Sequence, residues 1–308
     1  MTRYPFASYD AFTDTSFGGS QAFVISDAAG IDSDTMRKIA VETGAPATCF
    51  VLATDDNMIQ ARFMSTIAEL PMCGHGTMCL MTRMVEEGVI ALAKETKVDV
   101  ELHLPTTVAK VELSLRDDNL PQVLLDIQPP KFRQDSVDPD ELAALLGITK
   151  ADFSADHPIE TAVGDFIHLV VPIASLAAMQ RITPNFNGIV QFCHKHDVQT
   201  VAVFCTQVEQ VDYHLHVRDF CPAVGVPESA AAGTTNGALT SYLIRHNMVQ
   251  PDTQGVITVR AEQGHEIDRR SSIRSIVTMD DDKIQRLQVG GVATKIMDGA
   301  LHLPKTAD

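Results

Sequence analysis

Two glycine-rich segments, each followed by an apolar helical pattern, constrain what this chain can fold into more than any other feature. They are Cys73-Gly74-His75-Gly76-Thr77 and Ala232-Gly233-Thr234-Thr235-Asn236-Gly237. An arginine, a phenylalanine and a glutamate precede each segment in the same order: Arg62, Phe63 and Glu69 before the first, and Arg218, Phe220 and Glu228 before the second. The offsets differ, so the repeat is loose. It nevertheless predicts two similar halves that each contain one such helix.

The pattern breaks at Gln128-Pro129-Pro130, which marks the expected boundary between the halves. A chain of 308 residues is long enough for two cores. We assign residues 1–128 and 129–308 to the two halves, with the last strands free to pack back on the first half. Most of the chain reads as short strands. Helices are expected over residues 33–41 with Ser33 as the cap, 77–86, 139–146 with Asp138 near the N-cap, and 235–246.

Both glycine-rich segments are typical of helix starts that bind anions. The first turn of a helix carries unpaired N–H groups and about half a positive charge, so small residues there let a carboxylate or phosphate reach the backbone. Gly74, Gly76 and Gly233 leave that approach open, and the hydroxyls of Thr234 and Thr235 can cap the helix or donate to the anion. The alternative is that both segments are ordinary tight turns into capped helices. Their matching contexts favour one shared cleft.

Cys73 and His75 lie where proton chemistry is expected. The positive end of a helix would lower the pKa of the Cys73 thiol, as it does in reactive cysteines. A histidine between two glycines can exchange a proton near neutral pH. The alternatives are that Cys73 is a small buried hydrophobic residue and that His75 bonds to its own turn. Cys79, inside the apolar helix, is expected in the core.

Charge and hydropathy disfavour several classes of partner. The formal net charge is −16, whereas nucleic acid and anionic membranes attract cationic surfaces. No segment approaches the roughly 20 apolar residues of a membrane span, and no N-terminal targeting pattern is present. We therefore expect a cytoplasmic protein that binds neither nucleic acid nor membrane.

Neither a metal site nor a disulfide is expected. The six cysteines include no C-x-x-C pair and should be free thiols. His194 and His196 lie two residues apart without an evident third ligand, so we interpret them as part of a solvated loop or helix end.

Several motifs together resemble the PhzF-like (phenazine-biosynthesis-like) isomerase and epimerase family. In chain order they are residues 9–14 with 17–19, residues 62–63 leading to 69–71 and 73–75, residues 218–237, residues 263–264 with 269, and residues 289–299. The resemblance covers nearly the whole chain. It implies an α+β fold like that of diaminopimelate epimerase, with two pseudo-symmetric halves, each a β-barrel-like sheet around a central helix, and the site between them. It also implies proton transfer on small carboxylates without metal or organic cofactor, usually in a homodimer.

The chain departs from the family pattern where the family carries its acid–base groups. The usual catalytic glutamate corresponds to Ala47, and the aspartate of the second signature corresponds to Ser229, which also lies roughly at the second thiol position of the epimerases. Thr234 replaces a serine, and Ser20 stands in the usual Gly-Asn-Pro segment. Glu42, a nearby carboxylate, is expected on the preceding helix. The phenazine-type reaction is therefore not expected.

These observations predict an isomerase or epimerase that moves a proton on a small carboxylate with one base; a dehydratase or lyase fits the same chemistry. Cys73 or His75 would take the proton, and Ser229 would position or donate, since a hydroxyl is a poor base near neutral pH. Two alternatives stay open: a small-anion binding module that has lost catalysis, and a two-base epimerase that recruits another cysteine. The expected substrate-binding residues are Ser20, Gly74, Gly76, Gly233, Thr234 and Thr235.

Overall fold

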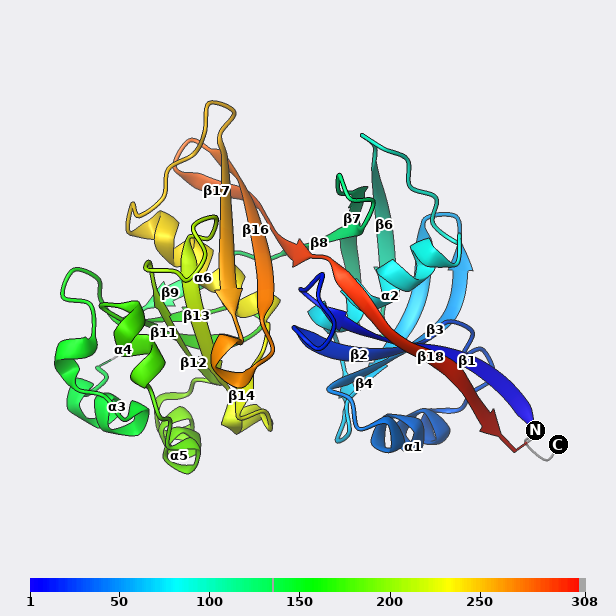
Figure 1. Cartoon of the computed structure of the whole chain (residues 1–308), viewed down its shortest axis with the longest axis horizontal. Helices are drawn as coiled ribbons and strands as arrows, with labels where there is room; N and C mark the ends of the chain where they lie inside the picture. Colours follow the sequence, from blue (N-terminus) through cyan, green and yellow to red (C-terminus); the bar gives the residue numbers. More distant parts are fainter. Residues whose placement is uncertain (135, 305–308) are drawn as a thin grey trace. The chain divides into compact units, whose positions relative to one another are not determined.

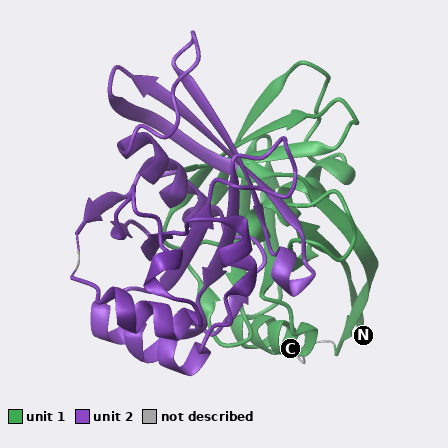
Figure 2. Ribbon diagram, turned by 60° about the vertical axis from the view of Figure 1, so that its left-hand side comes forward, with its two compact units in different colours: residues 1–126, 290–308 green, residues 127–289 purple. Residues whose placement is uncertain are grey.

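The computed structural model describes residues 1–134 and 136–304. The chain forms two compact units, coloured separately in Figure 2. Unit 1 contains residues 1–126 together with the segment that begins at residue 290, and unit 2 contains residues 127–289. The last strand of the described chain therefore belongs to the unit formed by the first 126 residues.

Unit 1 is mainly a sheet with two helices (Figure 1). The antiparallel pairs are β1–β18, β1–β2, β3–β4, β6–β7 and β7–β8. The pairs β2–β3 and β4–β6 are parallel. Helix α2 packs against β1, β2, β3 and β18 and is buried on most sides. The elements are β1 (Thr2–Ala11), β2 (Ser20–Ile25), α1 (Ser33–Thr43), β3 (Ala47–Asp55), β4 (Met58–Met64), β5 (Glu69–Leu70), α2 (Gly74–Glu86), β6 (Lys97–His103), β7 (Val108–Leu115), β8 (Pro121–Ile127) and β18 (Ala293–Leu303).

Unit 2 has a similar sheet and four helices. Helix α6 packs against β11 and β16 and is also largely buried. The elements are β9 (Lys131–Arg133), α3 (Pro139–Leu146), β10 (Glu160–Val163), β11 (Ile167–Pro172), α4 (Leu176–Arg181), α5 (Phe186–His196), β12 (Thr200–Cys205), β13 (Leu215–Phe220), β14 (Glu228–Ser229), α6 (Gly233–Arg245), β15 (Val256–Gln263), β16 (Ser271–Asp280) and β17 (Lys283–Gly291), with short 3₁₀ turns at Lys150–Asp152, Pro222–Val224 and His265–Ile267.

The strand pairing confirms the α+β class and the internal repeat. The parallel pairs β2–β3 and β4–β6 of unit 1 correspond to β11–β12 and β13–β15 of unit 2. The short strands β5 and β14 pair with β4 and β13 just before α2 and α6, and both helices are 13 residues long. The registers of the two units can be compared strand by strand. They match Val24 with Val170, Cys49 with Ala202, Phe63 with Asp219, and Leu70 with Ser229.

The predicted helices are present, with corrections at their starts. Asp138 caps α3 as expected. The prediction that Ser33 caps α1 is wrong: the cap is Asp32, whose carboxylate accepts a hydrogen bond from the Thr35 amide at 2.9 Å. α2 and α6 begin at Gly74 and Gly233, two to three residues earlier than expected, because the glycines lie inside the first turn.

Helices α4 and α5 were not predicted. The apolar side of α5 packs into the core of unit 2. His194 and His196 lie in its last turn, which confirms their interpretation as a helix end. All six cysteines are free, and within the described residues no helix is both long and apolar enough to cross a membrane.

Candidate active site

The two central helices start without the side-chain caps that the other α-helices of the described chain possess. In α1, α3, α4 and α5 a side-chain oxygen of the cap residue accepts a hydrogen bond from a first-turn amide; these residues are Asp32, Asp138, Ser175 and Asn185. The caps of α2 and α6 are Cys73 and Ala232, which make no side-chain cap hydrogen bond. First-turn amides of α2 and α6 can therefore serve an anion instead.

The two glycines at the start of α2 have different reasons to be glycine. A Cβ at Gly74 would meet nothing within 4 Å, so this position faces open space. A Cβ at Gly76 would lie 3.0 Å from Cys73 Sγ, 3.2 Å from Cys49 Sγ and 3.2 Å from Phe63 Cδ1. Gly76 is thus required by packing around the Cys73 sulfur, whereas Gly74 leaves room for a ligand.

Gly76→Ala should therefore lower the free energy of unfolding by about 1–3 kcal/mol, the usual cost of overpacking a core. Gly74→Ala is the matched control on the same turn. Alanine favours the helix over glycine by up to about 1 kcal/mol, so this variant should be unchanged or slightly more stable. Chemical denaturation followed by circular dichroism measures both, and equal losses in the two variants would contradict the packing argument.

Cys73 and His75 are close enough to exchange a proton. Cys73 Sγ lies 3.5 Å from Nδ1 and 3.6 Å from Nε2 of His75. Burial raises the pKa of Cys73 to about 12 and lowers the pKa of His75 to about 4. The expected lowering of the Cys73 pKa by the helix is wrong, because burial outweighs it. At neutral pH the pair is a thiol that can donate and an imidazole that can accept.

The other candidates of unit 1 lie on the strands and helix around α2. Ala47 is the first residue of β3 and is fully buried beside Ala22 of β2, so no carboxylate occupies that position. Glu42 lies on α1, as expected, and is exposed. Ser20 begins β2. Cys79 is buried, and its thiol contacts the Tyr9 carbonyl at 3.8 Å, as expected for a core residue.

Ser229 does not correspond to Cys73. The residue of unit 2 at the helix cap is Ala232, and the strand registers match Ser229 with Leu70. The hydroxyl of Ser229 donates to the Ala231 carbonyl at 3.2 Å, within its own turn. The sequence-based match of Ser229 to a second thiol position is therefore wrong by three residues, and no thiol stands at the cap of α6.

The two threonines at the start of α6 have different surroundings. Thr234 lines a small pocket together with His168 and Phe166. Thr235 is fully buried, and its hydroxyl donates to Asp219 Oδ2 at 2.9 Å. The Thr235 hydroxyl thus faces the interior of unit 2. Sequence reasoning missed His168 and Asp219, because their proximity depends on strand register.

The sequence and the fold are similar to those of known proteins. A family model described as Phenazine biosynthesis-like protein matches residues 9–299. The chain belongs to this family.

An uncharacterized isomerase of Clostridium acetobutylicum is 26% identical over 98% of this chain and 99% of its own length. Trans-2,3-dihydro-3-hydroxyanthranilate isomerase of Pseudomonas aeruginosa is 27% identical over 98% of this chain and 100% of its own length. A PhzF-family protein of Bacillus anthracis has a similar solved structure, with a TM-score of 0.88, 23% identity and coverage of 98% and 100% of the two chains. A hydroxyproline epimerase of Agrobacterium vitis, solved with trans-4-hydroxy-L-proline, has a TM-score of 0.61 at 12% identity and coverage of 98% and 91%. The predicted resemblance and epimerase-like fold are confirmed.

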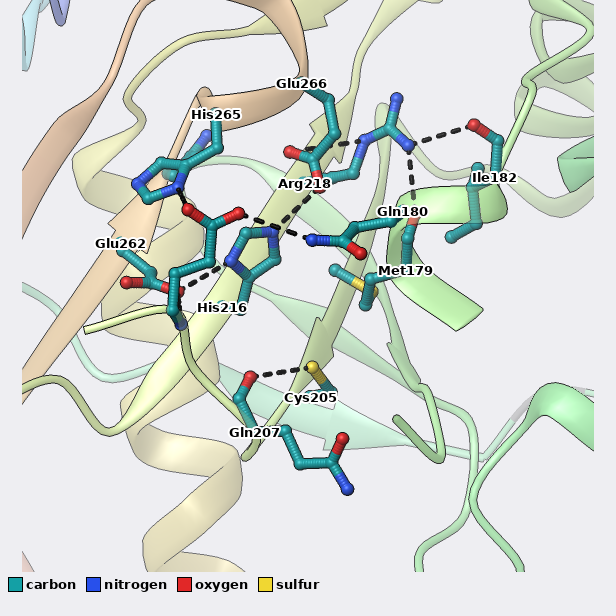
Figure 3. A network of polar contacts seen from close by, with 12 residues as sticks. Met179, Gln180, Ile182, Cys205, Gln207, His216, Arg218, Glu262, His265 and Glu266 are labelled. Carbon is teal, nitrogen blue, oxygen red and sulfur yellow. Dashed lines mark hydrogen bonds and ion pairs between the residues drawn. The ribbon is translucent and has the colours of Figure 1, made fainter. Parts of the chain in front are cut away.

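In this phenazine biosynthesis-like chain, a network of buried charged side chains holds the segment that precedes α6. Figure 3 shows the part of this network around Arg218 and His216. Arg218 forms two hydrogen bonds of 2.9 Å to the carboxylate of Glu228. Its third nitrogen donates to the carbonyls of Met179 and Ile182 at 3.1 and 3.0 Å. The arginine of the sequence repeat therefore ties β13, the strand β14 before α6 and the end of α4 together.

His216 extends the network between two carboxylates. Its Nδ1 lies 2.8 Å from Glu262, and its Nε2 lies 2.8 Å from Glu266. Within the described residues, Glu209, His216 and His265 form the one group whose possible metal-ligand atoms all lie within 4.8 Å of one another. Carboxylates already occupy both nitrogens of His216, and Glu209 occupies Nδ1 of His265 at 2.9 Å. We therefore interpret the cluster as an ionic network.

The network should make stability depend on pH through His216. Burial alone would lower the pKa of His216, but hydrogen bonds and charges of Glu266 and Glu262 outweigh it, and the pKa is raised above 6.5. A raised pKa in the folded state stabilises the fold below about pH 6.5 and loses that contribution as the pH rises through the folded value. At mildly acidic pH, wild type should therefore have a higher free energy of unfolding than His216→Gln. This difference should become smaller as the pH rises to alkaline values. Denaturation at several pH values measures this difference, with a variant of the partly exposed His103, His103→Gln, as control. A constant difference would contradict the charged state of His216.

Proposed function

We propose that the protein is a cofactor-independent isomerase or epimerase that moves a proton on a small carboxylate. The observation that carries the proposal is the pair of central helices whose starts lack side-chain caps, in contrast to the four capped helices. A carboxylate would take the place of the missing caps, held by first-turn amides of both α2 and α6. The small carboxylate in the solved hydroxyproline epimerase supports this substrate class.

Each candidate residue has a role in this proposal. The amides of Gly74, Gly76, Gly233, Thr234 and Thr235 would bind the carboxylate, with hydroxyl contributions from Ser20 and Thr234. His75, neutral above about pH 4, would take the proton from the carbon next to the carboxylate and return it to the same or another carbon. The Cys73 thiol would donate a hydrogen bond to the developing negative charge. Ser229 would hold the turn before α6 through its bond to Ala231.

The proposed reaction differs from the phenazine-type reaction because Ala47 stands where the family usually has its catalytic glutamate. The position is fully buried and has no carboxylate, so we propose a different substrate from that of the Pseudomonas relative. The same observation favours a second candidate, a small-anion binding module without catalysis.

Solvent-deuterium exchange distinguishes the two candidates. Chelator-treated protein is incubated in deuterated water with a panel of small amino, hydroxy and unsaturated acids, beside Cys73→Ser and His75→Ala variants. Exchange at Cα that disappears in His75→Ala supports the isomerase. Exchange with retained configuration indicates one base, and exchange with inversion indicates two. Binding without exchange supports the binding module, and neither binding nor exchange with any acid would contradict both.

A further inference from the structure

A buried polar cluster in unit 2 has no counterpart in unit 1. The parallel ladder of β2 and β3 places Ala22 beside Ala47, and the equivalent ladder of β11 and β12 places His168 beside Thr200. Unit 1 is therefore apolar at the position of the family's usual glutamate. Unit 2 carries a histidine and a hydroxyl at the matching positions.

Asp219 and Thr235 complete this cluster. Thr235 donates its hydroxyl proton to Asp219 Oδ2 at 2.9 Å, and its oxygen lies 3.5 Å from Nδ1 of His168. The Thr200 hydroxyl lies 2.8 Å from the same nitrogen. Asp219 is also the cross-strand partner of Ser229, where the family carries its aspartate. A carboxyl group thus lies on the neighbouring strand, opposite Ser229.

The hydrogen bonds indicate which nitrogen of His168 carries the proton. The Asp219 carboxyl accepts hydrogen bonds from the hydroxyls of both Thr235 and Thr200. Because each hydroxyl has a single proton and gives it to Asp219, both oxygens are acceptors toward Nδ1 of His168, which favours the tautomer with the proton on Nδ1. Nε2 then keeps a lone pair, which makes it a proton acceptor.

His168 lines a small pocket beside the start of α6. His168 is only 2% exposed, and its Nε2 has no hydrogen-bond partner among the described residues. Leaving a buried polar atom unpaired is costly, so an unpaired Nε2 calls for an explanation, such as a catalytic role. His168 lines the small pocket that also contains Thr234 of the first turn of α6, together with Gly164, Asp165 and Phe166 of the β10–β11 turn.

We propose that His168 is a second proton-transfer residue, whose Nε2 contacts the substrate next to the carboxylate subsite at Thr234, and that Asp219 positions it through Thr235. The inference rests on the proposed function. Nε2 takes a proton from an atom of the substrate other than the carbon at which His75 acts, the imidazolium donates from Nδ1 to the threonine hydroxyls next to Asp219, and the proton later returns from Nε2 to product, so no other reactant is needed. Unit 2 thereby supplies an acid–base group that Ser229 cannot provide.

Nitrogen-15 NMR of histidine-labelled protein tests the proposed arrangement without a substrate. His168→Gln assigns the signals, and wild type should show the Nδ1–H form of His168 at neutral pH. Thr235→Val should shift the tautomer population. Thr240→Val is the matched control, because Thr240 is equally buried on α6 but donates to the Asn236 carbonyl. An Nε2–H form in wild type, or equal effects of the two variants, would overturn the proposal.

Oxalate titration separates this inference from the function on which it rests. Oxalate should shift the backbone amide of Gly233 and the His168 ring together. His168→Gln should lower exchange of a panel acid by about 10²–10⁴-fold. A shift of Gly233 without any change at His168 would overturn the role of His168 alone. No shift at either residue would contradict both proposals.

Discussion

Arg218→Met should lower the free energy of unfolding by about 3–5 kcal/mol, the cost of leaving a buried charge without its partner. The Arg218 and Glu228 side chains are 5% and 4% exposed. Removal of the guanidinium would leave the Glu228 carboxylate and the carbonyls of Met179 and Ile182 without their donor. Because Glu228 belongs to β14, directly before α6, the loss should also disorder the start of that helix.

The internal repeat provides a matched control for this variant. Arg62 makes the same two bonds to Glu69, at 2.7 and 2.8 Å, but these side chains are 21% and 37% exposed. Exposed pairs contribute about 0–1 kcal/mol, so Arg62→Met should cost no more than that. Urea denaturation of both variants measures the contrast. Equal losses would show that burial does not determine the strength of the repeated pair.

His75→Gln should reduce solvent-deuterium exchange by about 10²–10⁴-fold, the usual contribution of a general base. Cys73→Ser should lose less, because a serine hydroxyl can still donate a hydrogen bond. The reason for this order is electrostatic: burial leaves His75 neutral and able to accept, while the pKa of Cys73 of about 12 keeps its thiol protonated.

The state of Cys73 can be measured without a substrate. The ultraviolet absorbance of thiolate in wild type should match that of Cys73→Ser throughout the neutral range. Thiolate absorbance that is present near neutral pH in wild type and missing in the variant would make Cys73 the base and contradict the assignment to His75.

Local signals in the sequence were sufficient for much of the fold. The repeated arginine, glutamate and glycine-rich segment identified the two central helices, and Asp138 followed by Pro139 marked the start of α3. Ser33 was mistaken for a cap because Asp32 beside it has the same capping chemistry. The short α4 and the partly apolar α5 are stabilised by packing in unit 2, a non-local contribution that periodicity does not reveal.

The candidate site was less predictable, because it depends on register and burial. Helix position alone suggested a reactive Cys73, but the pKa reflects how completely the fold removes the thiol from water. Sequence spacing matches Ser229 to a thiol position, whereas the helix cap equivalent to Cys73 is Ala232 and strand pairing matches Ser229 with Leu70. His168 and Asp219 are 51 residues apart in the sequence. The pairing of β11, β12 and β13 brings them close, and Thr235 contacts both.

The proposed function requires that one carboxylate binds at the starts of both α2 and α6. Backbone amide NMR of the whole chain during a titration with oxalate measures this binding. The amides of Gly74 and Gly233 should shift along a single binding curve, with one oxalate bound per chain. A response at only one of the two helices, or two independent curves with two oxalates bound, would contradict the proposal.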